Sequence, residues 1–290
     1  MRVLINGKKT PKPEWLRVKN NQSPNRAAVE DLLKNLNLNT VCSEADCPNY
    51  GVCFSRKTAT FMILGKTCTR NCGFCNVSNG SPESVNPDEP ANIAKAVKSL
   101  GLQYVVVTSV TRDDLPDGGA AHFSQTISEI QKATPHTLIE VLVPDFAGNI
   151  EALETVANSS PDVISHNMET VKRLYPHVRP QADYERSLDL IRQIKKANPK
   201  IKSKSGIMVG FGETADEVYM LFDDLINTDC DFFTSGQYLQ PTRNHVPVVE
   251  YVEPDVFDEY GAVARGKGFK FVASAPLVRS SFNAGEALGV

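Results

Sequence analysis

The chain has 290 residues, 41% of them hydrophobic, which is enough for one large domain or two smaller ones. Its formal net charge is −3 and no lysine or arginine block stands out, which argues against a nucleic-acid partner. The apolar runs are much shorter than the roughly 20 residues that cross a bilayer, and the N-terminus lacks the features of a signal or transit peptide. We therefore expect a cytoplasmic protein that has no membrane segment.

The first 25 residues are polar and interrupted by prolines. Pro11, Pro13 and Pro24 favour an extended lead-in rather than a packed element. A short helix is predicted over residues 26–36. Little periodicity follows until a strand-like run begins at Ala59.

The cysteines are clustered. Of the seven, six lie between Cys42 and Cys75, and only Cys230 stands apart. Disulfides are disfavoured in a protein without an export signal, so clustered cysteines indicate metal ligands first. We expect Cys230 to be a small buried apolar residue.

The first triplet, Cys42, Cys47 and Cys53, has the spacing CX4CX5C. Three cysteines leave one metal ligand missing. Zinc would require a fourth cysteine or a nearby histidine, but the first histidine in the sequence is His122 and Cys230 is remote. The fourth ligand must come from elsewhere in the chain or be absent.

The second triplet, Cys68, Cys72 and Cys75, follows directly on the strand-like run 59–64. Three thiolates in a tight loop can bind three irons of a [4Fe–4S] cluster, which leaves the fourth iron open to a small molecule. A zinc knuckle or a chance grouping is the alternative interpretation of this spacing taken alone.

Short apolar runs rich in Val, Ile and Phe recur along the rest of the chain and predict strands buried on both faces. They are residues 59–64, 104–109, 138–143, 162–166, 204–209, 231–236 and 269–274. Apolar residues at helical spacing separate several of them, over 93–100, 123–130, 184–191 and 218–225. This alternation predicts a partial parallel (β/α) barrel with its chemistry at the C-terminal ends of the strands.

The second triplet resembles the CxxxCxΦC signature of the radical S-adenosylmethionine (SAM) superfamily, with Phe74 as the aromatic residue. Residues 206–213 resemble its GxIxGxxE strand, with Met208 in the isoleucine position, Gly210 as the second glycine and Glu213 as the acid. Glycine at a strand end lets the backbone approach a ligand closely. The alternative role of Glu213 is to cap the next helix. The resemblance implies that SAM binds the open iron and is cleaved to a 5′-deoxyadenosyl radical.

Over nearly its whole length the chain resembles the lipoyl synthase family. The motifs that carry this resemblance are Lys12-Pro-Glu-Trp-Leu-Arg-Val-Lys19, Cys47-Pro-Asn, Thr58-Ala-Thr-Phe-Met-Ile-Leu-Gly65, Thr108-Ser-Val-Thr-Arg-Asp-Asp-Leu-Pro-Asp-Gly-Gly119, His166-Asn-Met-Glu-Thr170, Arg179-Pro-Gln-Ala-Asp-Tyr-Glu-Arg-Ser-Leu188, Gln237-Tyr-Leu-Gln-Pro-Thr242 and Arg279-Ser-Ser281. Phe282 and Lys57 depart from residues that are usual in the family, Tyr and Gly, but leave every candidate ligand in place.

This second resemblance implies that the first triplet holds an auxiliary [4Fe–4S] cluster, so that the enzyme carries two. It also implies a serine as the fourth ligand, which we assign to Ser281, with Ser280 as the alternative. A hard oxygen donor suits an iron–sulfide cluster less well than thiolate does, so a serine that detaches easily would open one iron of a cluster that gives up sulfide.

The reaction implied is hydrogen abstraction at C6 and C8 of an octanoyl group amide-linked to a lysine of a carrier domain, followed by sulfur insertion. One SAM is consumed for each abstraction. The carrier would be the E2 subunit of a 2-oxoacid dehydrogenase or the glycine cleavage H protein, and a ferredoxin or flavodoxin would supply electrons. Thr108, Asn167 and Arg179 are candidate SAM contacts. Arg112 lies beyond a predicted strand end, where it could steer a carboxylate.

Two other functions are alternatives to lipoyl synthesis. Biotin synthase, another radical SAM sulfur-inserting enzyme, lacks the CX4CX5C motif. A two-cluster electron-transfer protein would need neither an open iron nor a SAM-binding strand. We expect three regions: an N-terminal extension over 1–57, a radical SAM barrel over 58–275 and a C-terminal tail over 276–290, with the two extensions closing the active-site mouth.

Overall fold

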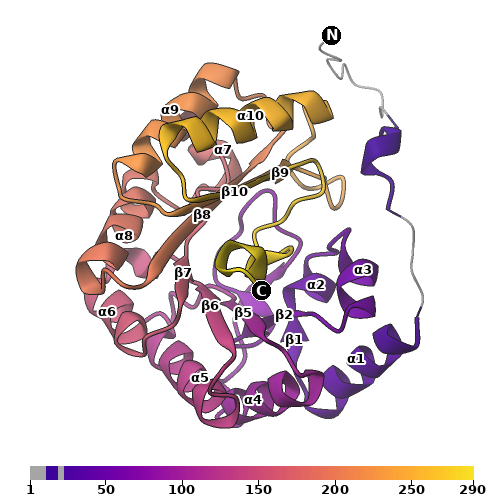
Figure 1. Cartoon of the computed structure of the whole chain (residues 1–290), viewed down its shortest axis with the longest axis vertical. Coiled ribbons are helices and arrows are strands. Elements are labelled where there is room, and N and C mark those ends of the chain that lie inside the picture. The colour runs from indigo at the N-terminus through magenta and orange to yellow at the C-terminus, as the bar shows by residue number, and fades with distance from the viewer. Residues whose placement is uncertain (1–10, 19–22) are drawn as a thin grey trace.

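The computed structural model describes residues 11–18 and 23–290. Its main sheet has eight strands whose spatial order follows the chain (Figure 1). They are β1 (Asn39–Thr40), β2 (Thr60–Ile63), β5 (Tyr104–Ser109), β6 (Leu138–Leu142), β7 (Val163–Ser165), β8 (Lys202–Val209), β9 (Phe232–Gln237) and β10 (Phe271–Ser274). Only the β1–β2 pair is antiparallel. In the described residues β1 and β10 are the free edges of the sheet, so the predicted partial parallel barrel is confirmed.

Helices form a layer around the outside of the curved sheet (Figure 1). They are α4 (Glu89–Leu100), α5 (Ala120–Ala133), α6 (Ile150–Asn158), α8 (Tyr184–Ala197), α9 (Ala215–Ile226) and α10 (Pro254–Lys267), with the single-turn α7 (Tyr175–Val178) before α8. The four helices expected from apolar spacing correspond to α4, α5, α8 and α9. Their buried faces form two hydrophobic clusters with the outward side chains of the strands. This layer leaves the inner side of the sheet free for chemistry.

The N-terminal region is more structured than its prolines suggest. A 3₁₀ turn over Glu14–Leu16 buries Leu16. Helix α1 (Pro24–Asn35) begins at Pro24, and the side chain of Ser23 caps it by accepting from the amide of Arg26. The expectation of an extended lead-in was therefore wrong at these positions, since proline is well tolerated in the first turn of a helix. Residues 1–10 and Lys19 lie outside the described residues.

Short elements occupy the cysteine-rich stretch, where no periodic pattern was visible. Helices α2 (Val41–Glu44) and α3 (Tyr50–Ser55) carry two cysteines of the first triplet, and β3 (Thr67–Cys68) pairs with β4 (Ser78–Asn79) around the second. Helix α3 packs on α1, where the Tyr50 hydroxyl donates to a Glu30 carboxylate oxygen at 2.6 Å. The two triplets thus sit on folded segments next to the edge of the sheet.

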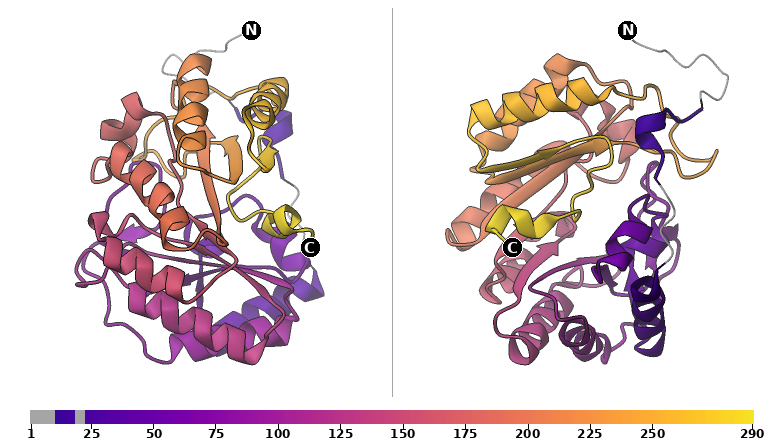
Figure 2. Two further views of the ribbon diagram at one scale, coloured as in Figure 1. Left: turned by 60° about the vertical axis from the view of Figure 1, so that its left-hand side comes forward. Right: turned by 45° about the vertical axis from the view of Figure 1, so that its right-hand side comes forward.

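The chain returns across the inside of the barrel after β10. In Figures 1 and 2 this yellow segment and the 3₁₀ helix η4 (Ala284–Leu288) lie within the curve of the sheet. The amide of Gln237 donates to the carbonyl of Pro276 at 3.0 Å. Gly236 allows the close approach, because a Cβ at that position would lie 2.0 Å from the Val278 carbonyl oxygen. The tail is therefore part of the wall of the interior.

In the part of the chain that the structure describes, no helix is both long enough and apolar enough to span a bilayer.

Cys230 lies two residues before β9 and is buried as predicted. Its sulfur contacts the carbonyl of Phe232 at 3.4 Å, and burial raises the pKa of the thiol to about 12. We expect Cys230→Ser to keep full iron content, because a hydroxyl can donate to the same carbonyl, and to lose roughly 1–2 kcal/mol of unfolding free energy. Iron analysis and chemical denaturation test this. Loss of a cluster would show that the ligand set is wrong.

Candidate active site

A cavity of about 1370 Å³ occupies the inner side of the barrel. It brings together side chains from both ends and the middle of the sequence. Its lining includes all of the candidate cluster ligands, which are Cys42, Cys47, Cys53, Cys68, Cys72, Cys75, Ser280 and Ser281. All the cysteines are free thiols. The sequence-predicted ligands of two separate motifs and of the C-terminal tail therefore face one space.

The second triplet is held on a loop with fixed backbone contacts. The amides of Arg70 and Thr111 both point at Cys68 Sγ, at 3.4 and 3.3 Å. The amide of Gly73 donates to the Val178 carbonyl at 2.9 Å, and a Cβ at Gly73 would lie 2.7 Å from Val246. Phe74 also lines the cavity. Backbone donors aimed at a sulfur are typical of thiolates that carry negative charge in a metal site.

The first triplet is carried by α2, α3 and the turn between them. Burial raises the pKa of Cys42 to about 12 and that of Cys53 to about 11. Burial likewise raises the pKa of Cys75, in the second triplet, to about 12. A buried thiol ionises only when a cation compensates its charge, and iron does this by direct ligation. Cys42, Cys53 and Cys75 are therefore suited to become thiolates when iron binds them.

The described residues contain no group of three or more His, Cys, Asp or Glu side chains placed to hold a single metal ion. A cubane cluster differs from a single ion, because it offers each thiolate an iron of its own. Two triplets of thiols on one cavity fit two such clusters in residue type and number.

Contacts across the molecule connect the serine-bearing tail to the rest of the site. The side-chain amide of Asn49, two residues after Cys47, donates to the Leu277 carbonyl at 2.8 Å. The ammonium of Lys204 donates to the Ser280 carbonyl at 2.7 Å. Ser280 Oγ is buried without a hydrogen-bond partner among the described residues, and Ser281 lines the same cavity. A buried hydroxyl without a partner is costly, so this position is suited to a ligand.

Two of the predicted SAM contacts, Asn167 and Arg179, each have a buried polar atom without a hydrogen-bond partner among the described residues. Asn167 donates from its side-chain nitrogen to Glu169 at 3.0 Å, while its buried Oδ1 has no partner in the described residues. Arg179 donates to the carbonyls of Asn167 and Met168 at 2.9 and 3.2 Å, and its buried Nε has no partner there. Both residues line the cavity. An acceptor and a charged donor side by side suit the amine and carboxylate of an amino acid.

Thr108 and Met208 line the cavity too, and the Thr108 hydroxyl already donates to the Leu142 carbonyl at 3.0 Å. At Gly206 a Cβ would lie 2.3 Å from Thr234 Oγ1 and 3.3 Å from Asn167 Oδ1. The absence of a side chain there leaves backbone open to the cavity.

Gly210 and Glu213 do not line the cavity and lie in the turn that follows β8. Gly210 has φ +109°, and a Cβ there would lie 2.2 Å from Gln237 Nε2. The Glu213 carboxylate accepts from the amides of Gly210 at 2.6 Å and Phe211 at 3.0 Å. The capping interpretation of Glu213 is wrong, because Thr214 caps α9. Glu213 therefore shapes the turn that ends the strand.

Arg112 does not face the cavity. Its guanidinium pairs with Asp114 through two contacts of 2.9 and 2.8 Å and donates to the Leu64 carbonyl at 3.2 Å. The suggestion that it steers a carboxylate is therefore not supported, and its role is to fix the end of β2.

A buried polar network beneath the tail was not predicted from the sequence. Both carboxylate oxygens of Glu140 accept from Lys204 at 3.0 Å, and the hydroxyls of Tyr104 and Ser165 donate to the same carboxylate at 2.6 and 3.0 Å. Glu140 is fully buried and Lys204 is 1% exposed. The sequence did contain an indication of this network. Glu140 and Lys204 are charged residues inside predicted buried strands, and a buried charge needs a partner.

We expect Lys204→Met to lose about 3–5 kcal/mol of unfolding free energy, because it leaves the Glu140 carboxylate buried without its counter-ion. Lys204→Met/Glu140→Gln should recover part of that loss, since the remaining group is neutral. Denaturant titrations of the metal-free proteins measure both. A single variant as stable as the parent would show that the pair does not hold the interior together.

Comparisons with known proteins agree with this architecture. Residues 62–225 match the model of the Radical SAM superfamily. Lipoyl synthase of Alkaliphilus metalliredigens is 56% identical over 277 residues, which cover 96% of each chain. Lipoyl synthase of Caldicellulosiruptor bescii is 56% identical over 94% of each chain.

Solved structures show the same fold at low identity. Methylornithine synthase aligns with a TM-score of 0.51 at 13% identity, over 88% of this chain and 84% of that one. Coproporphyrinogen III oxidase from Escherichia coli aligns with a TM-score of 0.52 at 13% identity, over 71% and 52%. These two support the fold alone. The relatives above decide the family, and the chain belongs to the lipoyl synthase family of the radical SAM superfamily.

Proposed function

We propose that Cys68, Cys72 and Cys75 hold the [4Fe–4S] cluster at which SAM binds, and that the first triplet holds the auxiliary cluster that supplies sulfur. The enzyme uses SAM and two [4Fe–4S] clusters, as lipoyl synthases do, and its reaction is sulfur insertion at C6 and C8 of a protein-bound octanoyl-lysine to give lipoyl-lysine. The observation that carries the residue assignment is that both triplets and the serine-bearing tail line one cavity.

The chemistry explains why two clusters must share a cavity. An aliphatic C–H bond has no acidity for a general base to exploit, so the bound cofactors supply the radical and the sulfide. The protein must then hold the octanoyl chain between the two triplets and exclude other reactants. A single cavity with cysteines from both motifs suits that requirement.

We assign SAM binding to the polar atoms near Cys72. Arg179 would pair with the SAM carboxylate, and Asn167 would accept from its amine, since each has a buried atom without a partner in the described residues. Thr108, Phe74 and Met208 would form the walls against the ligand, and Gly210 with Glu213 would set the turn behind it.

For the fourth ligand of the auxiliary cluster we retain Ser281, with Ser280 as the alternative. Both serines line the cavity, and Ser280 is the one whose buried hydroxyl lacks a partner among the described residues. Either would be positioned by the Lys204–Ser280 and Asn49–Leu277 contacts.

We also propose three functional regions, 1–57, 58–275 and 276–290, although β1 of the first region adds an edge strand to the sheet. The substrate class is a lipoyl carrier domain. Among carriers we propose the E2 subunit of 2-oxoacid dehydrogenases or the glycine cleavage H protein, with ferredoxin or flavodoxin as the reductant. A cytoplasmic location is proposed because free thiols that bind iron–sulfur clusters persist in a reducing compartment.

A test of this function starts from the anaerobically reconstituted protein. About eight irons and eight sulfides per chain are expected, because each cubane contains four of each. Reduction with SAM should yield 5′-deoxyadenosine, and octanoylated carrier domains should acquire a dithiolane detectable by mass spectrometry. Biotin-synthase-type chemistry would instead act on a free small molecule. An electron-transfer protein would leave SAM intact.

A further inference from the structure

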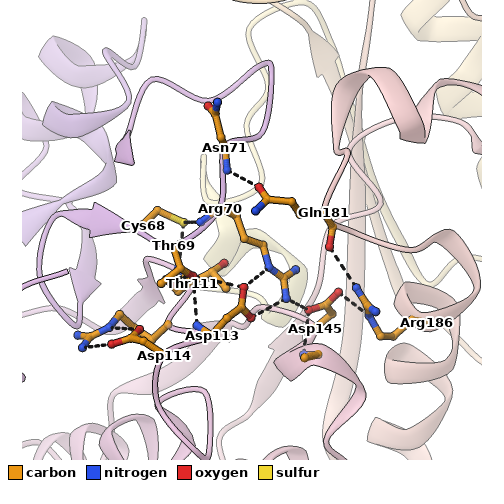
Figure 3. Close-up of polar contacts among 12 residues, drawn as sticks. Cys68, Thr69, Arg70, Asn71, Thr111, Asp113, Asp114, Asp145, Gln181 and Arg186 are labelled. Atoms are coloured by element: carbon orange, nitrogen blue, oxygen red, sulfur yellow. Dashed lines mark hydrogen bonds and ion pairs between the residues drawn. The ribbon is translucent and has the colours of Figure 1, made fainter. Parts of the chain in front are cut away.

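Four charged side chains form a chain of ion pairs behind the second triplet (Figure 3). Arg70, inside the loop between Cys68 and Cys72, makes two contacts of 2.7 and 2.8 Å with Asp113. The same guanidinium reaches Asp145 at 2.6 Å, and the other oxygen of Asp145 accepts from Arg186 at 2.8 Å. The chain of pairs therefore joins the cysteine loop to the segments that follow β5 and β6 and to the start of α8.

Gln181 connects the far end of this chain of ion pairs back to the cysteine loop. Gln181 accepts the amide of Asn71 at 2.6 Å with its side chain, and its carbonyl accepts from Arg186 at 3.3 Å. The position of Arg70 is thus fixed by the ion pairs of its side chain and by the hydrogen bond from the amide of Asn71, the next residue, to Gln181 (Figure 3). A residue fixed at both places has little freedom to reorient its peptide groups.

The central pair of this chain, Arg70 with Asp145, is buried and ionised. The side chain of Arg70 is 6% exposed and that of Asp145 is fully buried. Burial alone would raise the pKa of Asp145, but the hydrogen bond and charge of Arg70 hold it well below its usual value. Two acids and two arginines alternate, so their charges cancel. Because the net charge is zero, the effect of this group on a nearby cluster is expected to come mainly from geometry.

What this geometry fixes is a pair of donors on Cys68. The sulfur accepts from the amides of Arg70 and Thr111. Thr111 in turn accepts from the amide and the hydroxyl of Thr69, both at 3.0 Å, and Asp113 donates its amide to that hydroxyl at 3.1 Å. The two segments that these hydrogen bonds connect, 68–70 and 111–113, are also joined by the Arg70–Asp113 ion pair.

We propose that Arg70 is a positioning residue which, through Asp113 and Asp145, keeps two N–H groups on Cys68 and thereby raises the reduction potential of the cluster that binds SAM. This inference rests on the assignment of that cluster to the second triplet. Hydrogen bonds to a cluster sulfur stabilise the reduced, more negative state, and removing them makes reduction harder.

The test is a potentiometric titration of the reconstituted holoenzyme followed by EPR. The signal of interest is the one that changes when SAM is added, which separates it from the auxiliary cluster. Arg70→Met should shift the midpoint to a more negative potential while the other signal keeps its midpoint. Arg70→Lys should recover only part of the shift, since an ammonium cannot reproduce the two-pronged contact with Asp113.

Asp113→Ala separates geometry from charge. It removes a negative charge near the cluster, so a purely electrostatic effect would raise the potential. Loss of the clamp would lower it, and that is the result we expect. Because the Asp113 side chain is 37% exposed, this variant also remains informative if Arg70→Met fails to fold.

The matched controls are Arg112→Met and Asp114→Ala. They break the neighbouring two-contact ion pair, which lies in the same segment but does not touch the cysteine loop. They should leave the midpoint where it is in the parent. An unchanged midpoint in Arg70→Met, or a raised one in Asp113→Ala, overturns the proposal. A parent protein with no SAM-sensitive signal would instead reject the cluster assignment itself.

Discussion

Cys68→Ala should abolish reductive cleavage of SAM while the auxiliary cluster still assembles. In the proposed assignment each thiolate of the second triplet would hold one corner of the cubane next to the open iron, and Cys68 accepts from two backbone N–H groups. The same result is expected for Cys72→Ala and Cys75→Ala. The measurement is 5′-deoxyadenosine formed after reduction, together with iron content.

Iron should fall from about eight to about four atoms per chain in these variants, since one of two cubanes is lost. Cys230→Ser is the matched control, because it removes a buried thiol that lines no part of the cavity. If all three alanine variants continued to produce 5′-deoxyadenosine at the parental rate, the radical SAM assignment of this triplet would have to be abandoned.

Cys42→Ala, by contrast, should give a protein that still cleaves SAM but makes no lipoyl product. The second triplet is intact in that variant, whereas the source of sulfur is missing. Cys47→Ala and Cys53→Ala should behave alike, because the three thiolates are proposed to share one cluster. Product is measured by mass spectrometry of the carrier domain, and 5′-deoxyadenosine is measured in the same reaction.

Labelled sulfide placed only in the auxiliary cluster should appear in the product, and turnover without cluster repair should stop after one equivalent. Ser281→Ala and Ser280→Ala should assemble more auxiliary cluster than any of the cysteine variants, because three thiolates still anchor it. A Cys42→Ala enzyme that thiolated the octanoyl chain would contradict the role of sulfur donor. The first triplet would then have an electron-transfer or structural function.

The strands and half of the ten α-helices in the described residues could be predicted, because local patterns determine them. Seven apolar runs became β2 and β5 through β10, since a strand buried on both faces reads as a continuous hydrophobic stretch. The capping role of Asp183, which accepts from the amide of Arg186, also follows from its position before α8. Helices α2 and α3 were missed because four and six residues are too few to show a period.

The contacts of the site were harder to predict, because they join residues that are distant in sequence. Arg112 pairs with the acid two positions away in the sequence, whereas Arg70 pairs with two acids that are 43 and 75 positions away. Only the sheet order brings the segments after β2, β5 and β6 together. Local pattern therefore identified the cysteines but could not identify what orients them.

The bond from Asn49 to Leu277 spans 228 residues of sequence. During synthesis the N-terminal part of a chain is available to fold first, so the second triplet and the strands around it can form before the tail exists. The auxiliary site, with its serines and its anchor on Asn49, is completed only by the last segment made. A polypeptide that stopped before Leu277 would retain every residue assigned to radical generation and lack part of the sulfur-donating site.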